Sequence, residues 1–217
     1  HEIKNPLTPI QLTIDRLKNK YSNVLDENNK ENFKDNLKII NNQIKQIEKL
    51  VNEFSDFARM PKPIFQKNDL VILIKDNIKL LQELDKTIKI DFIHNNKQLF
   101  FEGDKEQLSR VFLNLIKNSI ESIQQKAEKD SNFSKIITIE LNNFDTHIGL
   151  IINDNGIGFK NLNKNIKEIL NPYFTTKKEG TGLGLSIVNK IINDHNGNIE
   201  FISKVDGATI KITFIKK

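Results

Sequence analysis

The chain has 217 residues, of which 37% are hydrophobic and 28% are charged, and its formal net charge is +5. This length is enough for one or two domains, and the composition is that of a globular chain rather than a disordered one. The absence of cysteine excludes a disulfide framework, a cysteine-ligated zinc site and a thiol nucleophile. The lysines are mixed with acidic residues along the chain, so the positive charge does not predict nucleic-acid binding.

The chain begins with His-Glu-Ile rather than with methionine, which suggests a fragment of a longer protein. It contains no apolar run that approaches the roughly 18 residues needed for a membrane helix. Its first residues also lack the basic-then-apolar pattern of a secretory signal. We therefore expect this piece to be soluble and to have no membrane segment.

Residues 1–60 predict two amphipathic helices joined by a polar turn within residues 19–32. Apolar side chains recur at steps of three and four in both arms, which places them on one face of each helix. They are Ile3, Leu7, Ile10, Ile14, Leu17 and Tyr21 in the first arm, and Phe33, Leu37, Ile40, Ile44, Ile47, Val51, Phe54 and Phe57 in the second. A lone hairpin cannot bury both faces, so we expect a four-helix bundle formed by a homodimer. Packing of the hairpin on the rest of its own chain is the alternative.

Pro61 and Pro63 end the second helix, because two prolines separated by one residue cannot continue it. We place a domain boundary here, which gives domains at 1–60 and 61–217. The second domain predicts helices at 69–84, 104–126, 166–170 and 183–195, and strands at 88–93, 98–102, 135–142, 147–153, 198–204 and 208–215. This uneven order favours an α+β sandwich, with a mixed sheet under helices, over a doubly wound fold.

The predicted helix 104–126 carries Asn114 and Asn118 four residues apart on one face, and Ser119 falls on its apolar side. Amide oxygens are good ligands for hard cations. Taken alone, however, the two asparagines are better explained as a polar surface that faces solvent.

The segment Asp154-Asn155-Gly156-Ile157-Gly158 follows an apolar strand. A carboxylate at a strand end can accept a hydrogen bond from an exocyclic amine such as that of adenine. The two glycines allow a ring or a phosphate to approach the main chain. A plain β-turn is the alternative interpretation.

The segment Gly180-Thr181-Gly182-Leu183-Gly184-Leu185-Ser186 opens a predicted helix. Alternate glycines free the main-chain amides, and the helix N-terminus adds partial positive charge, so the segment is suited to phosphate. Its spacing differs from that of the Gly-x-x-x-x-Gly-Lys-Ser/Thr loop, and no parallel βαβ unit surrounds it. A flexible loop before a helix is the alternative.

Together and in this order, the three segments resemble the N, G1 and G2 boxes of the histidine-kinase type of ATP-binding domain. That group shares its fold with DNA gyrase, the chaperone Hsp90 and MutL. The intervening run Asn171-Pro172-Tyr173-Phe174-Thr175-Thr176-Lys177 resembles the F box. The run His1-Glu2-Ile3-Lys4-Asn5-Pro6-Leu7 resembles the H box of sensor histidine kinases, and residues 1–17 and 53–61 resemble the NtrY type of nitrogen-regulation sensor kinase.

This resemblance implies that Asn118 holds Mg²⁺ and that Asp154 binds the amino group of adenine. Gly156 and Gly158 would shape the adenine floor. Further contacts to ATP are implied for Asn114, Lys117, Phe174, Lys177, Gly180, Thr181, Gly182, Leu183 and Gly184.

The resemblance further implies that His1 is phosphorylated by ATP, with Glu2 accepting a hydrogen bond from Nδ1–H so that Nε2 is free to attack. The Glu-x-x-Asn spacing of Glu2 and Asn5 goes with dephosphorylation of a response-regulator receiver domain, here of the NtrX type. We expect that partner to dock around Ile10, Thr13 and Arg16. The chain would be the cytoplasmic portion of a membrane-anchored bacterial sensor.

Two other functions are open to the same fold. Hydrolysing relatives carry a glutamate one turn before the Mg²⁺ asparagine, and the residue here is Asn114, which is a poor base. The sequence therefore disfavours an ATPase that activates water. A dimeric scaffold with an inactive nucleotide site is the second alternative, although the expected ATP contacts are intact.

Overall fold

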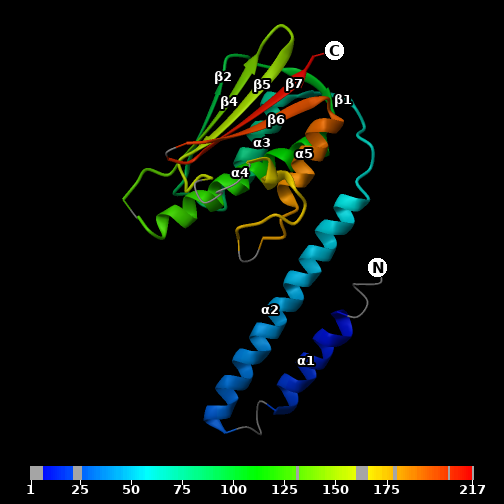
Figure 1. The fold of residues 1–217 in the computed structure, drawn as a ribbon, viewed down its shortest axis with the longest axis vertical. Coiled ribbons are helices and arrows are strands. Elements are labelled where there is room, and N and C mark those ends of the chain that lie inside the picture. The colour runs from blue at the N-terminus through cyan, green and yellow to red at the C-terminus, as the bar shows by residue number, and fades with distance from the viewer. Residues whose placement is uncertain are drawn as a thin grey trace. The chain divides into compact units, whose positions relative to one another are not determined.

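The computed structural model describes residues 7–21, 26–130, 132–159, 166–177, 180–204 and 206–216 (Figure 1). Contacts within the chain divide it into two compact units, residues 1–60 with 175–183 and residues 61–174 with 184–217. The break after Met60 falls where the two prolines interrupt the second helix. Among the helices of the described residues, none is both long enough and apolar enough to span a membrane.

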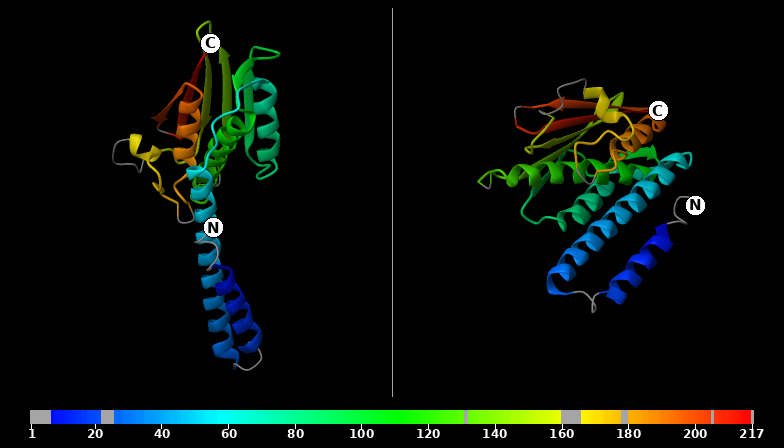
Figure 2. Two further views of the ribbon diagram at one scale, coloured as in Figure 1. Left: turned by 90° about the vertical axis from the view of Figure 1, so that its right-hand side faces the viewer. Right: turned by 60° about the horizontal axis from the view of Figure 1, so that its bottom comes forward.

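The first unit contains two antiparallel helices, α1 (Leu7–Tyr21) and α2 (Glu27–Ala58), which lie side by side (Figures 1 and 2). Each helix contributes two buried side chains seven residues apart to their common core, Leu7 and Ile14 from α1 and Leu37 and Ile44 from α2. Phe33 packs against this core. The predicted helical hairpin is confirmed.

The connection between the two helices lies within the predicted segment 19–32. The first helix continues to Tyr21 and the second begins at Glu27, while residues 22–25 lie outside the described residues. Asp26 is the N-cap of α2, and its carboxylate accepts the main-chain N–H of Asn29 at 2.9 Å. This cap starts the helix within a run of residues whose own helix propensity is low.

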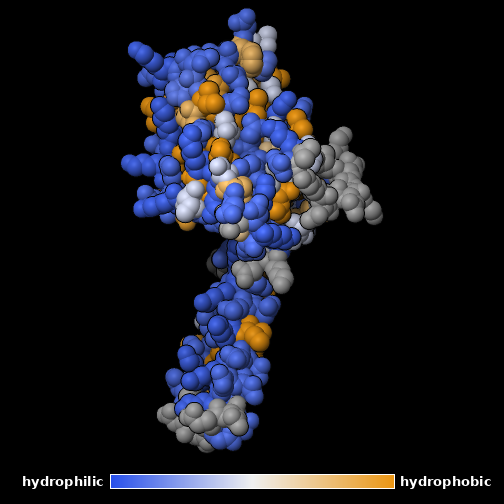
Figure 3. Space-filling view, turned by 90° about the vertical axis from the view of Figure 1, so that its left-hand side faces the viewer, coloured by the Kyte–Doolittle hydropathy of each residue, from blue (hydrophilic) through white to orange (hydrophobic). Residues whose placement is uncertain are grey.

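The apolar face predicted for each helix is divided into two stripes. One stripe is the buried core of the hairpin. The other, called the open stripe below, has side chains between 38% and 45% exposed, and consists of Ile10 and Leu17 on α1 and Ile40, Ile47 and Phe54 on α2. Members of each stripe on a helix recur every seven residues, and a single neighbouring helix covers only one of them. Apolar side chains are accordingly visible on the surface of the hairpin (Figure 3).

The second unit is built on a five-stranded sheet with the order β2-β4-β5-β7-β6. Its strands are β2 (Lys89–His94), β4 (Ile136–Asn143), β5 (His147–Asp154), β6 (Gly197–Ser203) and β7 (Ala208–Ile215). The β2–β4 pair is parallel and the other pairs are antiparallel. Two short strands, β1 (Gln66–Asp69) and β3 (Phe100–Gly103), form a separate antiparallel pair.

Helices α3 (Leu70–Gln82), α4 (Lys105–Ala127) and α5 (Gly184–Asp194) cover one face of this sheet (Figures 1 and 2). Alternate residues of the central strands point to the helices and are buried, as Ile148, Leu150 and Ile152 of β5 show. A short 3-10 helix, η1 (Ile166–Leu170), precedes α5. The predicted α+β sandwich with a mixed sheet is therefore confirmed.

Two aspartates fix the starts of α3 and α4. Asp69 accepts the N–H of Val71 at 2.9 Å, as its position before the helix predicts. Asp104 accepts the N–H groups of Glu106 and Gln107 at 3.0 Å, and its second oxygen accepts that of Ile64 at 2.9 Å. The cap of α4 therefore also holds the chain that follows the two prolines.

The buried His195 joins the end of α5 to the start of α4. Its Nε2 accepts the main-chain N–H of Asp104 at 2.9 Å, and its Nδ1 lies 2.8 Å from the carbonyl oxygen of Ile191. Because Nε2 is the acceptor, Nδ1 carries the proton and donates to that carbonyl. The imidazole thus links the two helices through both of its ring nitrogens.

Two local features differ from the sequence analysis. Strand β1 is absent from the predicted elements, because Gln66-Lys67-Asn68-Asp69 is wholly polar and has no alternating pattern. Helix α5 begins at Gly184 and ends at Asp194, one residue inside each predicted bound, and Asn196 beyond it has a left-handed φ of 55°. After glycine, asparagine is the residue that most often takes this conformation where a helix ends.

Candidate functional site

The two asparagines of α4 lie one helical turn apart and are both half-buried. The Nδ2 group of Asn114 donates to the carbonyl oxygen of Arg110 at 2.9 Å. Its Oδ1 would lie 3.1 Å from a Cβ added to Gly184, the first residue of α5. The middle of α4 and the N-terminus of α5, which are far apart in sequence, therefore meet at Asn114.

Asp154, the last residue of β5, is a carboxylate only 7% exposed. Its Oδ1 accepts the N–H of Gly156 at 3.0 Å, and its Oδ2 accepts the hydroxyl of Ser119 at 3.2 Å. Burial raises the pKa of Asp154, while these two hydrogen bonds act in the opposite direction. Ser119 directly follows Asn118, so the predicted base-binding and metal-binding residues are joined through one serine.

The two glycines after Asp154 are required by close contacts with the protein's own main chain. A Cβ on Gly156 would lie 2.2 Å from Oγ and 2.6 Å from the carbonyl carbon of Ser122. Gly158 has a φ of 63°, and a Cβ there would lie 2.2 Å from the carbonyl oxygen of Gly207. The loop that follows Asp154 is consequently pressed between α4 and the β6–β7 turn.

Lys117 is exposed on α4, where its ammonium group lies 4.0 Å from the Glu121 carboxylate. Phe174 is half-buried, and its N–H donates to the carbonyl oxygen of Asn171 at 3.2 Å. Tyr173, which directly precedes Phe174, has a left-handed φ of 69°. These residues belong to the second unit, as Asp154 does.

The remaining predicted phosphate contacts lie in 175–183, which belongs to the first unit. The N–H of Gly180 donates to the carbonyl oxygen of Lys177 at 3.2 Å, and Gly182 has a left-handed φ of 71°. The hydroxyl of Thr181 donates to the Glu53 carboxylate of α2, and Leu183 is buried. Lys178 and Glu179 lie outside the described residues.

His1, Glu2 and Asn5 lie outside the described residues, so their predicted roles rest on sequence alone. Within the described part of the chain, no group of three acidic or histidine side chains could hold a metal ion. Asn118 supplies an amide oxygen, a ligand type that divalent cations accept alongside oxygens of substrate and water.

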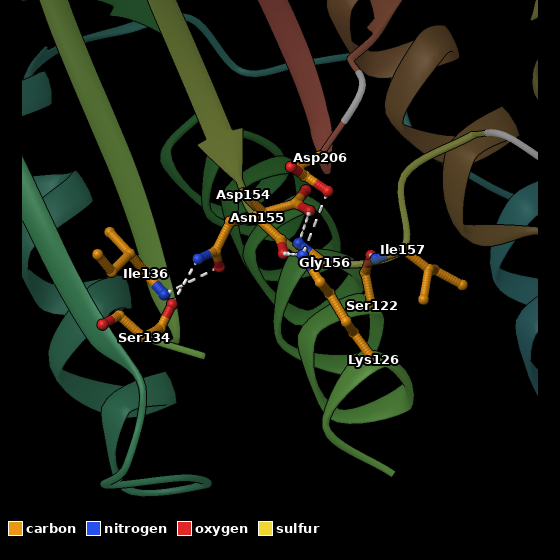
Figure 4. A network of polar contacts seen from close by, with 9 residues as sticks. All are labelled: Ser122, Lys126, Ser134, Ile136, Asp154, Asn155, Gly156, Ile157 and Asp206. Carbon is orange, nitrogen blue, oxygen red and sulfur yellow. Dashed lines mark hydrogen bonds and ion pairs between the residues drawn. The ribbon is translucent and has the colours of Figure 1, made fainter. Parts of the chain in front are cut away.

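Sequence reasoning missed the side chains that hold the loop after Asp154. The sequence predicts Ser119 on the packed face of its helix, and it predicts no role for Ser122, Lys126 or the Asn155 side chain. Figure 4 shows Ser122 and Lys126 directed at this loop, and the side chain of Asn155 directed at Ser134 and Ile136 on its other side. The available signal was the spacing of Ser122 and Lys126, which continue the asparagine face of α4 at steps of four after Asn118.

Two family descriptions match parts of this chain. Residues 103–217 match the family described as histidine kinase-, DNA gyrase B-, and HSP90-like ATPase. The chain belongs to this family. Residues 1–63 also match the His Kinase A (phospho-acceptor) domain. Membership of an ATPase family implies ATP as the nucleotide.

The chain is 39% identical over 215 residues to a putative sensor histidine kinase NtrY-like of Rickettsia prowazekii, and 35% identical over 215 residues to the nitrogen regulation protein NtrY of Azorhizobium caulinodans. These matches cover 99% and 98% of this chain but 34% and 27% of those proteins. The resemblance to NtrY-type sensor histidine kinases is thus confirmed. The chain spans about a third or less of the length of these relatives.

Among solved structures, the chain is similar to the histidine kinase ThkA in complex with the response regulator protein TrrA. The TM-score is 0.68 at 26% identity, with 100% of this chain and 59% of that chain covered. The catalytic domain of ThkA alone matches with a TM-score of 0.60 at 29% identity, over 70% of this chain and 96% of that domain.

Proposed function

We propose that this chain is the catalytic core of a sensor histidine kinase. It binds ATP, transfers the γ-phosphoryl group to His1 and passes that group to an aspartate of a response regulator. The observation that carries this proposal is the buried Asp154 carboxylate, joined through Ser119 to the helix that bears Asn114 and Asn118. Residues 1–60 are proposed as the phosphotransfer and dimerisation domain, and residues 61–217 as the ATP-binding domain.

Asp154 recognises the base in this proposal. An ionised carboxylate only accepts hydrogen bonds, so it suits the exocyclic amino group of adenine and disfavours a base that presents a carbonyl there. The glycine-rich loop after it, with Gly156 and Gly158, forms the floor of the base site. Low exposure of the carboxylate makes the hydrogen bond to the amine stronger than it would be in water.

Asn114, Asn118 and the start of α5 form the phosphate end. The amide oxygen of Asn118 is a hard ligand suited to Mg²⁺, which would neutralise phosphate charge. The phosphate oxygens bind to main-chain amides of the segment with Gly180, Gly182 and Gly184. The partial positive charge at the N-terminus of α5 strengthens this binding. Lys117 and Lys177 add positive charge, and Phe174, Thr181 and Leu183 complete the predicted set.

His1 is the proposed acceptor. Glu2 accepts a hydrogen bond from Nδ1–H, which fixes the tautomer and leaves the Nε2 lone pair free. A bond forms between Nε2 and the γ-phosphorus, and the bond from that phosphorus to the bridging oxygen breaks, releasing ADP. Glu2 also offsets the positive charge that the ring gains.

The structure of Asn114 favours a histidine acceptor over water. Its amide cannot take a proton, and its Nδ2 group is already committed to the carbonyl oxygen of Arg110. The residue one turn before Asn118 therefore offers no general base for hydrolysis. The intact contacts around Asp154 likewise argue against a scaffold with an inactive site.

The open stripe supports a homodimer. Its five side chains recur every seven residues on the two helices and face away from the core of their own hairpin. Pairing two hairpins through these stripes would produce the predicted four-helix bundle and remove the apolar side chains from water.

The partner that receives the phosphoryl group is proposed to be a receiver domain, with an NtrX-type regulator as the specific candidate. The similar kinase ThkA forms a complex with a response regulator, which supports this class of partner. Docking is proposed around Thr13 and Arg16 of α1, because Ile10, the third residue of the expected docking surface, belongs to the open stripe. Asn5 is proposed to position water for removal of the phosphoryl group, and the chain to be the cytoplasmic part of a membrane-anchored sensor.

Incubation with γ-labelled ATP and Mg²⁺ tests this function. We expect acid-labile, base-stable label on the wild-type chain and none on His1→Gln or Asp154→Ala. Steady release of phosphate without label on either the wild type or His1→Gln would instead assign the chain to the ATPases. Absence of both label and nucleotide binding would identify an inactive scaffold.

A further inference from the structure

We propose that Asn155 and Lys126 are positioning residues that orient Asp154 for recognition of the adenine amino group. Neither side chain is a proposed ligand of the nucleotide. They act on the main chain that follows Asp154, and the inference rests on the nucleotide site proposed above. Together with Ser122 they are called the loop clamp.

The Asn155 side chain extends the pairing of β5 with β4 by one residue. The last register pair of these strands is Asp154 with Ile137. Beyond it, Oδ1 of Asn155 accepts the N–H of Ile136 at 3.0 Å, and Nδ2 donates to the carbonyl oxygen of Ser134. One amide thus binds both a donor and an acceptor of the facing main chain, which fixes the direction in which the chain leaves Asp154.

Lys126 holds the same residue from the side of α4. Its Nζ donates to the carbonyl oxygen of Asn155 at 2.9 Å and lies over the ring of Phe133 at 4.7 Å from the centroid. It also lies 3.7 Å from the carboxylate of Asp206, whose side chain is 73% exposed. The side chain of Asn155 and its carbonyl group are therefore fixed by opposite neighbours, as Figure 4 shows.

Ser122 fixes the next part of the loop. The N–H of Ile157 donates both to the Ser122 hydroxyl at 3.1 Å and to the Ser122 carbonyl oxygen at 3.3 Å. Gly156 lies against the main chain of the same residue, where a Cβ could not fit. Residues 155–157 are consequently bound to α4 about one and two turns beyond Asn118.

The orientation of Asp154 depends on this loop, because its Oδ1 accepts the N–H of Gly156. A shift of the peptide at 155–156 would move that N–H and rotate the carboxylate away from the base. A hydrogen bond weakens steeply when its geometry is lost, so small movements are expected to affect base recognition first.

Lys126 contributes mainly to position rather than to global stability. An ion pair with an exposed carboxylate adds little to the free energy of unfolding. A charged hydrogen bond to one main-chain carbonyl, in contrast, restricts that peptide directly. We therefore expect removal of the ammonium group to leave the chain folded and to loosen the site.

The test compares the full chain's affinity for ATP and for purine riboside triphosphate, which lacks the amino group. The Kd for the analogue divided by the Kd for ATP measures recognition of that group. We expect Lys126→Met to weaken ATP binding about tenfold, the worth of one good hydrogen bond, and to change the affinity for the analogue less than about twofold. Lys126→Arg should restore most of the ratio, and the nearby exposed Lys129→Met should leave it unchanged.

Asn155→Ala provides an independent second variant and should lower the same ratio. Thermal unfolding of each variant identifies one that is not folded. Equal weakening of both nucleotides, or an unchanged ratio in both Lys126→Met and Asn155→Ala, would overturn the inference while leaving the proposed function intact. A wild-type chain that binds neither nucleotide would refute the proposed function, and this inference with it.

Discussion

Gly207, in the turn between β6 and β7, lies directly against the main chain of Asp154. A Cβ on Gly207 would lie 1.8 Å from the carbonyl oxygen of Asp154, and the φ of Gly207 is 90°. Gly207 also blocks the position of a Cβ on Gly158. The hairpin at the end of the chain therefore determines where the proposed base-binding carboxylate lies.

Gly207→Ala should therefore weaken nucleotide binding strongly and destabilise the second unit. The substitution puts alanine in a left-handed conformation and brings its Cβ into collision with main-chain atoms. Main-chain atoms cannot move aside as the end of a flexible side chain could. Gly149→Ala is the matched control, since its Cβ would meet only the ring of Phe144 at 3.3 Å. Calorimetric binding of ATP and thermal unfolding provide the two measurements, and similar results for both alanine variants would contradict this account.

Asp154→Asn should abolish the preference for adenine and alter the pH dependence of folding. Burial raises the pKa of Asp154 above that of an unfolded aspartate, so the folded state binds the proton more tightly. In the wild type, this group's contribution to stability is consequently lost as the pH rises from the ordinary aspartate pKa through the raised one. Asparagine does not ionise, so the variant should not lose this part of its free energy of unfolding as the pH rises. Urea unfolding of both proteins between about pH 4 and 7 measures the difference. Parallel stability curves for the two proteins would show that Asp154 does not titrate differently on folding.

Asp104→Ala should lower the free energy of unfolding by about 1–2 kcal/mol through loss of the helix cap. Burial alone would raise the pKa of Asp104, but hydrogen bonds from the N–H groups of Gln107, Ile64 and Glu106 outweigh it and lower the pKa. The stabilisation is therefore present above the ordinary aspartate pKa and is lost as the pH falls through the lower folded value. The difference between wild type and variant should thus shrink in acid. Asp130→Ala, at an exposed position beyond α4, should change stability by less than about 0.5 kcal/mol.

Ile47→Glu should convert the proposed dimer to a monomer. Ile47 is the central member of the open stripe on α2, so the change places a charge in the middle of the expected interface. Ile39→Glu is the matched control, since Ile39 is 59% exposed and belongs to neither stripe. Sedimentation equilibrium gives the mass of each protein. A monomeric wild type, or a dimeric Ile47→Glu, would exclude the open stripe as the interface.

Much of the architecture was predictable from local chemistry. Periodicity located the two long helices and α4, and Asp69 marked the start of α3 because capping depends on neighbouring residues only. The short strand β1 was not predictable, since its polar residues pair with β3 through main-chain atoms. The division of the hairpin's apolar residues into a buried and an open stripe likewise depends on where the second helix lies.

The site shows the same distinction. The sequence alone was sufficient to place the chain in its family and to propose the roles of its site residues. The signal was the order and spacing of Asn114, Asn118, Asp154 and the glycines of 180–184. Only the tertiary structure showed that Gly156 and Gly158 are required by Ser122 and Gly207, and that Asn155 and Lys126 hold the loop between them. These contacts join residues from α4, the start of β4 and the last hairpin. Sequence by itself determines which chemical groups are present, whereas the packing of distant segments decides which of them meet.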